Sequence, residues 1–337
     1  MPGTQRSVTL RFMAAPTDGN VRGRVGGGKM LEWIDKAGYA CAAGWSGTYC
    51  VTAYVGNIHF TRPVEVGDIV EVEARVVHTG RTSMHVVCTV SSGDPRDGEL
   101  TPSTQCLLIF VSVGEDGRPI PVAPWSPEDD WERTEQERAI RLMGVRQDIE
   151  ADMERQHYTD ATESCRETLR FMAAPTDVNW GGKVHGGIVM RWIDEAASLV
   201  ASRWHGGPSV AVYAGGARFY RPLLIGHLVE VEARLIYTGH SSMHISVHVR
   251  SGDPKTGEMA TTTHCTMVLV ALDDDWHKVH VRSWNPRLEE DLALQEHAKK
   301  QIDIRESLRR PLPVARPHAD GESPTSAPAE SSTASRR

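Results

Sequence analysis

Hydrophobic and polar positions follow an ordered succession of periods along the chain. Residues 7–13 alternate as in a short strand, and a turn-rich segment follows at 15–28. From Gly28 the apolar residues recur three and four positions apart, which predicts an amphipathic helix. Its apolar positions are Met30, Leu31, Ile34, Ala37 and Cys41. The pattern then predicts antiparallel strands at 51–60, 68–80, 82–92 and 105–113. One long helix followed by such strands indicates an α+β domain whose sheet packs on that helix.

The whole succession occurs twice. LRFMAAPTDGN at 10–20 corresponds to LRFMAAPTDVN at 169–179, and the offset of 159 residues still holds between SGDPRDGE at 92–99 and SGDPKTGE at 251–258. A repeat of this length is a duplicated domain and not a solenoid, whose units span about 20–50 residues. We therefore expect two domains related by a pseudo-twofold axis within one chain.

The repeat sets the expected domain boundaries. Domain 1 covers 7–125 and domain 2 covers 166–284. A charged, helix-favouring linker at 126–165 separates them, and a similar segment at 285–310 predicts a C-terminal helix. The tail at 311–337 is rich in Pro, Ser and Ala and poor in large apolar residues, so we expect it to be disordered.

Composition narrows the function classes. A net charge of −7 argues against a general nucleic-acid binder, which would need a basic surface. The longest apolar stretches, 106–113 and 266–272, are too short to span a bilayer, and the N-terminus lacks the apolar core of a secretory signal. We expect a cytoplasmic protein with no membrane partner. Its six scattered cysteines fit free thiols.

A glycine cluster opens each predicted helix, in RVGGGKMLEWID at 24–35 and in KVHGGIVMRWID at 183–194. A helix start offers unpaired amides and the positive end of the helix dipole, and glycine lets a ligand approach that backbone. Asp35 lies seven residues after Gly28, about 10 Å along the axis, so it cannot act at its own helix start. If the two helices lie antiparallel, each aspartate faces the other helix start: Asp35 faces Gly186 and Gly187, and Asp194 faces Gly27 and Gly28.

Each feature alone has an ordinary structural explanation, because glycines mark turns and aspartates lie on solvated helix faces. Both halves, however, keep Asn, Gly-Gly and Asp at the same spacing. The residues around Asp35 are apolar, with Trp33 and Ile34 before it and Ala37 after it. A carboxylate in such surroundings is costly unless it has a function, so we predict a composite site.

These residues resemble a known family. The two glycine-aspartate segments, the F-x-R-P-x-x-x-G segments at 60–67 and 219–226, and the TGRTSM and TGHSSM sequences are similar to the double hot-dog acyl-CoA thioesterases. The resemblance implies tandem hot-dog domains, each a long central helix wrapped by an antiparallel sheet. It also implies hydrolysis of fatty acyl-CoA to fatty acid and CoA at the domain interface, without a cofactor or metal.

The family motif can be carried over by position. It implies catalytic roles for Asp35, Asn179, Asp194 and Asn20, and substrate-binding roles for His185, Gly186, Gly187, Gly27 and Gly28. Gly26 stands where the first half would have the family's histidine. We expect both sites to be competent despite this departure. The carboxylate would act as general base or as nucleophile while backbone amides receive the oxyanion.

A basic rim is expected because CoA carries phosphates. The candidates near the site loops are Arg81, Arg62, Arg221, Arg22, Arg24 and Lys183. The resemblance also implies a homo-oligomer, a trimer of double hot dogs, because one pseudo-dimer would leave open sheet faces. No zinc-ligand spacing or phosphate-binding glycine loop occurs, so we expect no metal.

Two other functions stay open from the sequence. One is a non-catalytic protein that binds acyl-CoA. The other is a hot-dog hydratase or dehydratase, which would need a histidine paired with an acid; the glycine at position 26 counts against it.

Overall fold

The computed structural model describes residues 2–20 and 23–308, so the predicted disordered tail lies outside the described residues. The first half contains β1 (Ser7–Met13), a 3-10 turn (Pro16–Asp18), α1 (Gly27–Ser46), β2 (Cys50–Val55), β3 (Ile58–His59), β4 (Ile69–Thr79), β5 (Ser83–Gly93) and β6 (Thr101–Ser112). The helix α2 (Asp130–Glu154) follows. The second half contains β7 (Arg166–Met172), a 3-10 turn (Pro175–Asp177), α3 (Gly186–His205), β8 (Ser209–Phe219), β9 (Leu228–Thr238), β10 (Ser242–Gly252), β11 (Ala260–Ala271) and α4 (Glu289–Leu308).

The central helix of each half follows the predicted pattern. The five apolar positions predicted for the first helix are all buried, each with at most 4% of its surface exposed. Both helices end at a glycine in the left-handed region, Gly47 with φ of 70° and Gly206 with φ of 79°. Glycine adopts that conformation without steric cost, which explains why both helices stop there.

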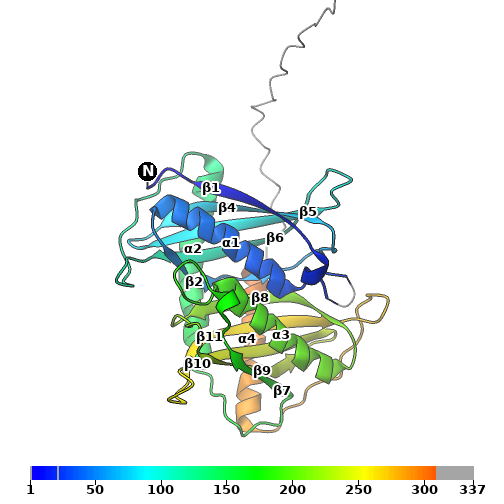
Figure 1. The fold of residues 1–337 in the computed structure, drawn as a ribbon. Coiled ribbons are helices and arrows are strands. Elements are labelled where there is room, and N and C mark those ends of the chain that lie inside the picture. Colours follow the sequence, from blue (N-terminus) through cyan, green and yellow to red (C-terminus); the bar gives the residue numbers. More distant parts are fainter. Residues whose placement is uncertain (1, 21–22, 309–337) are drawn as a thin grey trace, which may run out of the picture.

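The sheet packs on these helices through alternating residues. In β4, Val70, Val72 and Ala74 are fully buried in the core that contains α1, while the intervening Glu71 and Glu73 are not. Strand residues alternate between the two sheet faces, so the Val-Glu repeat places one face inside and one outside. Each half is therefore the long helix wrapped by an antiparallel sheet that the sequence predicted (Figure 1).

The strand predicted at 51–60 is interrupted, which corrects the sequence prediction. The chain leaves the strand after Val55 and pairs again only at Ile58–His59. Gly56 approaches β6 so closely that its amide donates to the carbonyl of Leu107 at 2.8 Å. A side chain at Gly56 would meet that carbonyl oxygen at 2.7 Å, so the break depends on glycine.

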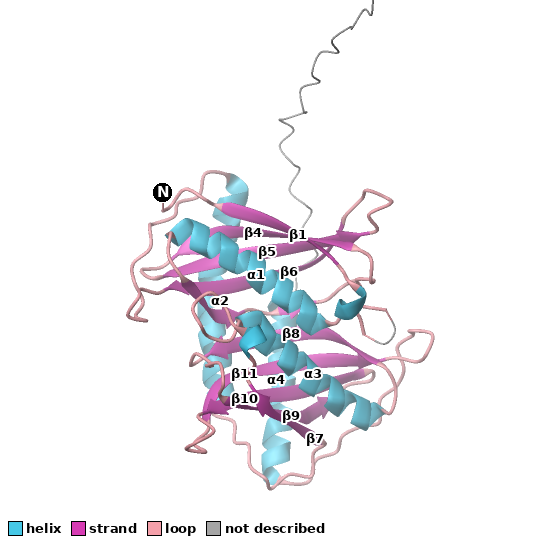
Figure 2. Cartoon of the chain, in the orientation of Figure 1, coloured by secondary structure: helices cyan, strands magenta, loops and turns pink. Residues whose placement is uncertain are grey.

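The two half-sheets form one continuous sheet, a feature that the sequence analysis did not predict. Its strand order is β1-β4-β5-β6-β2-β8-β11-β10-β9-β7, with β3 also paired to β8. Tyr54 pairs with Arg218 and Ile58 with Ala214 across the junction. The junction fixes the two central helices side by side on the same face of the sheet (Figure 2).

The charged segments form helices on the opposite face of the sheet, behind it in Figure 1. Ala139 of α2 packs on Val77 and Val87, and Leu294 of α4 packs on Ile236. The expectation of open sheet faces is therefore wrong for the parts that α2 and α4 cover.

Two smaller expectations can be compared with the structure. All six cysteines are free, and five of them are buried. None of the helices in the described part of the chain combines the length and the apolar character that crossing a membrane requires.

Candidate active site

The N-terminal halves of α1 and α3 pack against each other in opposite directions. The amide of Gly187 donates to Asp35 Oδ2 at 2.8 Å, and the amide of Gly28 donates to Asp194 Oδ2 at 2.9 Å. Each carboxylate therefore caps the start of the helix from the other half, where the helix dipole favours negative charge. The structure brings together the residues that the sequence analysis had paired across the pseudo-twofold axis.

Glycine at these positions serves helix packing as well as ligand approach. A Cβ added at Gly28 would lie 2.7 Å from Cα of Arg191, and one at Gly187 would lie 2.6 Å from Cα of Glu32. Real Cβ atoms do not approach backbone so closely, and packed interiors have no room to yield. From the sequence we had expected glycine here only because it lets a ligand approach these amides.

The carboxylate of Asp35 is fully engaged. Thr52 Oγ1 donates to Asp35 Oδ1 at 2.7 Å, and His185 Nδ1 lies 2.9 Å from Oδ2. His185 is the N-cap of α3, and its Nδ1 also lies 3.2 Å from the amide of Gly187. Asp35 is 3% exposed, so these contacts replace the water that a surface carboxylate would bind. We name this arrangement the Asp35 site.

The carboxylate of Asp194 has fewer partners. Ala211 stands at the position of Thr52, and Gly26 stands at that of His185. In the part of the chain that the structure describes, Asp194 Oδ1 is buried without a hydrogen-bond partner. Burial raises the pKa of Asp194 to about 6, although the Gly28 amide opposes this shift. We name this arrangement the Asp194 site.

The two asparagines shape the loops before the helices. Asn179 Oδ1 accepts the amides of Gly181 at 2.9 Å and Lys183 at 3.1 Å, and Asn20 Oδ1 accepts the amide of Arg24 at 3.2 Å. Such side-chain hydrogen bonds stabilise a tight loop because they replace the backbone hydrogen bonds that the loop lacks. Asn179 lines the cavity that contains Asp35, and Asn20 lines the one that contains Asp194.

Each site opens into its own cavity. The cavity of the Asp35 site has a volume of about 290 Å³, and that of the Asp194 site about 330 Å³. Apolar walls line both, which suits an acyl chain. They include Val111, Val113, Phe219 and Leu223 in the first, and Met30, Phe60, Val210 and Val212 in the second.

The predicted basic rim is divided between the sites. Lys183 and Arg221 line the cavity of the Asp35 site, and Arg24 and Arg62 line that of the Asp194 site. Arg81 lies in the exposed turn after β4 and is not among the residues that line either cavity. Arg22 lies outside the described residues.

Aromatic side chains at the cavity walls also differ. Trp180 stacks on Tyr39 with ring centroids 4.5 Å apart beside the Asp35 site. Trp276 covers the guanidinium of Arg24 at 3.8 Å beside the Asp194 site. Trp276 has a φ of 67° where the first half has Gly117. A bulky residue in this region is strained, so the second half keeps this ring despite a cost.

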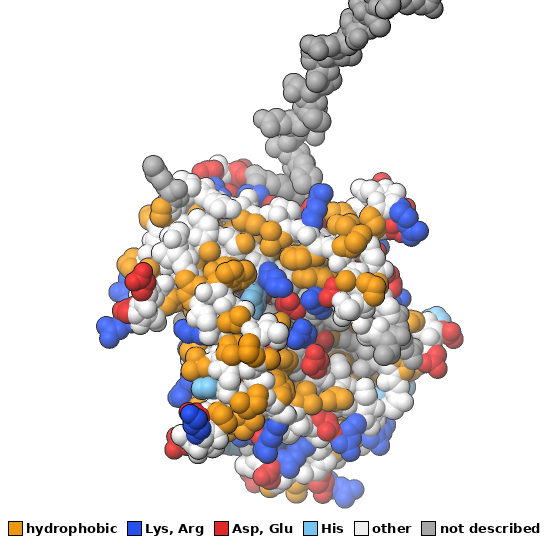
Figure 3. Space-filling view, viewed as in Figure 1, with side chains coloured by type: hydrophobic (Ala, Val, Ile, Leu, Met, Phe, Trp, Pro, Cys, Tyr) orange, Lys and Arg blue, Asp and Glu red, His pale blue; other side chains and the backbone are white. Residues whose placement is uncertain are grey.

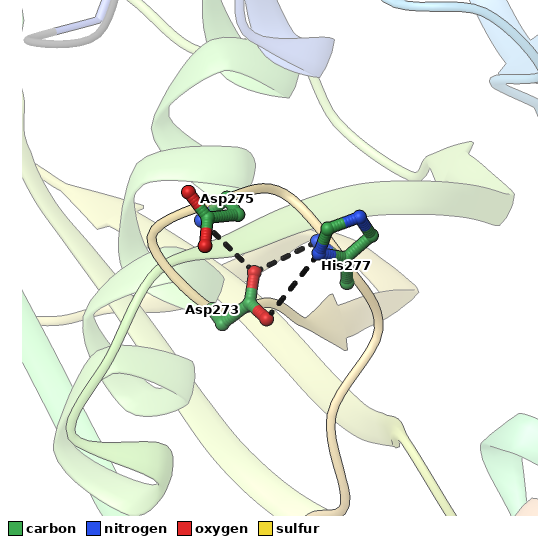
Figure 4. Close-up of side chains that lie close together, drawn as sticks. All are labelled: Asp273, Asp275 and His277. Atoms are coloured by element: carbon green, nitrogen blue, oxygen red, sulfur yellow. Dashed lines mark hydrogen bonds and ion pairs between the residues drawn. The ribbon is translucent and has the colours of Figure 1, made fainter.

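A loop next to Trp276 gathers Asp273, Asp275 and His277 (Figure 4). Asp273 Oδ1 accepts the amides of Asp275 at 3.0 Å and His277 at 2.9 Å. These amide bonds lower the pKa of Asp273, because they stabilise its charged form. The backbone turn therefore accounts for the cluster, and we assign no metal to it.

Thr52 was missed by the sequence analysis. A signal was available, because comparing the halves position by position shows threonine at 52 and alanine at 211. Only the fold shows that this strand residue lies beside the aspartate, since the two positions belong to different elements.

The fold of each half, its repetition along the chain and the pairing of the two helix starts together define the class of protein. The chain belongs to the thioesterase superfamily, whose family model matches residues 23–99 and 181–258, once in each half. Each half is a hot-dog domain, as the resemblance implied.

Individual relatives agree with this class. The chain is 34% identical over 121 residues to the acyl-CoA thioester hydrolase YciA of Salmonella typhimurium. The matched region covers 35% of this chain and 91% of that protein. It is 26% identical over 273 residues to the cytosolic acyl coenzyme A thioester hydrolase of Homo sapiens, covering 75% of this chain and 70% of that protein. The structure of a candidate oleoyl thioesterase from Lactobacillus plantarum has a TM-score of 0.56 at 11% identity, covers 81% of this chain and 100% of the other, and shows the same fold.

Proposed function

We propose that the protein hydrolyses acyl-CoA thioesters at sites that combine residues of both hot-dog domains. The observation that carries this proposal is the exchange of carboxylates between the two helix starts, Asp35 to Gly187 and Asp194 to Gly28. The names of the relatives, acyl-CoA and cytosolic acyl coenzyme A thioester hydrolases, support the substrate class. They also support a cytoplasmic location.

The chemistry follows from which groups are engaged. Because the amide of Gly187 already donates to Asp35, the amide of Gly186, the first of the helix, is the donor that we assign to the thioester oxygen. Asp35 takes a proton from water as the water attacks the carbonyl carbon. The carbon–sulfur bond then breaks, and the CoA thiolate receives a proton. If Asp35 attacks directly, an acyl anhydride forms and water opens it.

We assign most of the activity to the Asp35 site. Thr52 donates a hydrogen bond to the Asp35 carboxylate and His185 Nδ1 lies 2.9 Å from it, whereas the corresponding positions near Asp194 are Ala211 and Gly26. A catalytic group that is already fixed in its reactive position accelerates a reaction, because the site does not have to rearrange when the reaction occurs. This assignment ranks the two sites, both of which we expected from the sequence to be competent.

The test is thiol release from acyl-CoA substrates of different chain lengths, measured on Asp35→Asn, Asp194→Asn and the double variant. We expect Asp35→Asn to lower kcat by about 100-fold or more, and Asp194→Asn to lower it much less. The double variant should be inert while circular dichroism shows it folded. An active double variant would refute the role of the carboxylates. If the wild-type protein binds acyl-CoA but releases CoA from none of the substrates, the non-catalytic alternative would be favoured.

A hydratase is the second candidate, because the contact of His185 Nδ1 with Asp35 at 2.9 Å supplies a histidine paired with an acid. The same preparations can be supplied with an enoyl thioester. Hydration faster than thiol release on matched substrates would select this alternative. His185→Gln should abolish hydration, but hydrolysis needs the carboxylate more than the imidazole.

We also propose that copies of the double hot dog assemble, as a trimer, through surfaces that include the ends of the edge strands β1 and β7. Figure 3 shows the side of the molecule that carries α1 and α3, with hydrophobic side chains spread among charged ones. Met13 is 61% exposed and Met172, its counterpart in the second half, is 49% exposed. Large exposed apolar side chains at equivalent positions are typical of a surface that a partner covers.

A further inference from the structure

A third cavity lies away from both aspartates, between α2 and the outer face of the first half's sheet. Its volume is about 120 Å³. Thr61 is the lining residue that it shares with the cavity of the Asp194 site. Neither of the carboxylates lines it, so the proposed hydrolysis does not account for it.

The walls of this cavity are mostly apolar. The sheet and the helix both contribute aliphatic side chains, and an apolar group is more stable against them than in water. They are Val87, Leu107 and Ile109 from the sheet and Ala139, Leu142 and Met143 from α2.

Two buried nitrogen atoms among the lining residues lack hydrogen-bond partners in the described part of the chain. One is Nδ1 of His85, a residue with 3% of its surface exposed. The other is Nε of Arg146, which lies 3.5 Å from Glu150 without hydrogen-bond geometry. Buried polar groups in native proteins nearly always have a partner, because an unsatisfied one costs about 1–3 kcal/mol.

Burial lowers the pKa of His85 to about 3, so its imidazole is neutral at physiological pH. A neutral imidazole carries one N–H donor. A guanidinium donates through every one of its nitrogen atoms. The pair can therefore donate to an acceptor with negative charge in addition to Glu150.

The second half shows how the same place looks when it is filled. Tyr158 packs there, with its ring centroid 4.1 Å from that of His248 and its hydroxyl 3.0 Å from Ser246 Oγ. Ser246, Thr266 and Gln301 replace the apolar residues at 87, 107 and 142. The cavity that remains has a volume of only about 10 Å³.

We propose that the cavity under α2 binds a small aliphatic carboxylate. The carboxylate group accepts hydrogen bonds from Arg146 and His85, and the tail lies among the side chains of Leu107, Leu142 and Met143. An apolar cavity of about 150 Å³ holds one benzene molecule, so this one takes a tail of about four to six carbons.

Calorimetric titration of hexanoate into the full chain tests this proposal, with CoA present to occupy the proposed active sites. We expect one hexanoate per chain. Arg146→Gln should weaken binding by about tenfold or more, because it removes a charge-assisted hydrogen bond. Hexanol, which has the same tail without the charge, should bind correspondingly worse.

A second pair of variants tests the apolar wall. Leu142→Gln gives the first half the residue that the second half has, and should weaken hexanoate binding, whereas Gln301→Leu in the second half is the matched control and should not. The proposal would be overturned if the wild-type protein bound no hexanoate, or if CoA displaced hexanoate fully. It would also be overturned if Arg146→Gln and Leu142→Gln both left the affinity unchanged. Binding of hexanoate involves no turnover, so this result is independent of whether the protein hydrolyses thioesters.

Discussion

At the scale of single residues, the two aspartates have the same place in sequence and different surroundings. Asp35 receives hydrogen bonds from Thr52 and from the amide of Gly187, while Asp194 receives one from the amide of Gly28. The difference comes from two substitutions, alanine at 211 and glycine at 26. Duplication gave both halves the same fold, and single side chains then separated their chemistry.

Thr52 provides one test of that separation. Thr52→Ala should lower kcat for thiol release by about tenfold, because the lost hydrogen bond leaves Asp35 Oδ1 unpaired and less well held. Ala211→Thr is the matched change in the other half and should not lower the rate. Equal rates for Thr52→Ala and wild type would show that the hydroxyl has no part in catalysis.

The raised pKa of Asp194, about 6, makes stability depend on pH. The unfolded carboxyl has a pKa of about 3.9, so between pH 4 and 6 the folded protein holds this proton more tightly. The folded state is therefore progressively destabilised by this group as pH rises from about 4 to 6. Above about pH 6 the destabilisation stays constant.

Asp194→Asn removes the charge, so the variant should exceed wild type in stability above pH 6 by up to about 3 kcal/mol. The difference should vanish near pH 4. Urea unfolding at a series of pH values measures it. Asp35→Asn is the control and should lose stability at neutral pH, since its carboxylate is fully bonded; a pH-independent gain at Asp194 would contradict the assignment.

At the scale of elements, the crossing of α1 and α3 depends on glycine. Gly28→Ala and Gly187→Ala should each destabilise the protein by about 1–3 kcal/mol, because the added methyl group meets backbone of the other helix at less than 3 Å. Thermal unfolding followed by circular dichroism measures the effect.

Gly144→Ala in α2 is the matched control for this test. A Cβ at Gly144 meets nothing within 4 Å, so alanine should stabilise the helix by up to about 1 kcal/mol. A gain of stability in all three variants would show that helix propensity and not close packing determines the result.

Elements were predicted well where their pattern is local. The charged, helix-favouring segments expected at 126–165 and 285–310 contain α2 and α4, since a charged helix-forming run is itself a local signal. The single strand expected at 51–60 was wrong because the chain breaks at Gly56, where its amide bonds to Leu107 of the neighbouring strand β6. Contacts between strands leave no mark in the periodicity of one strand.

At the scale of the whole molecule, the proposed trimer can be tested by its surface. Met13→Glu with Met172→Glu should convert the assembly into single chains, because charges at a covered apolar surface are costly to bury. Light scattering after size exclusion measures the mass. Ile140→Glu is the control, since Ile140 is 46% exposed but lies on α2 and not on the edge strands β1 and β7. A wild-type protein that is already a single chain at micromolar concentration would contradict the proposal.

The sequence by itself determined the duplication, the α+β class of each half, the buried faces of the helices and the pairing of each aspartate with the opposite glycines. These follow from local periodicity and from a repeat that can be compared with itself. The tertiary structure alone decided that the half-sheets join through β2 and β8, that Thr52 holds Asp35, and that a cavity lies under α2. Each of these depends on atoms from segments distant in sequence, and their distances are set only when the whole core packs.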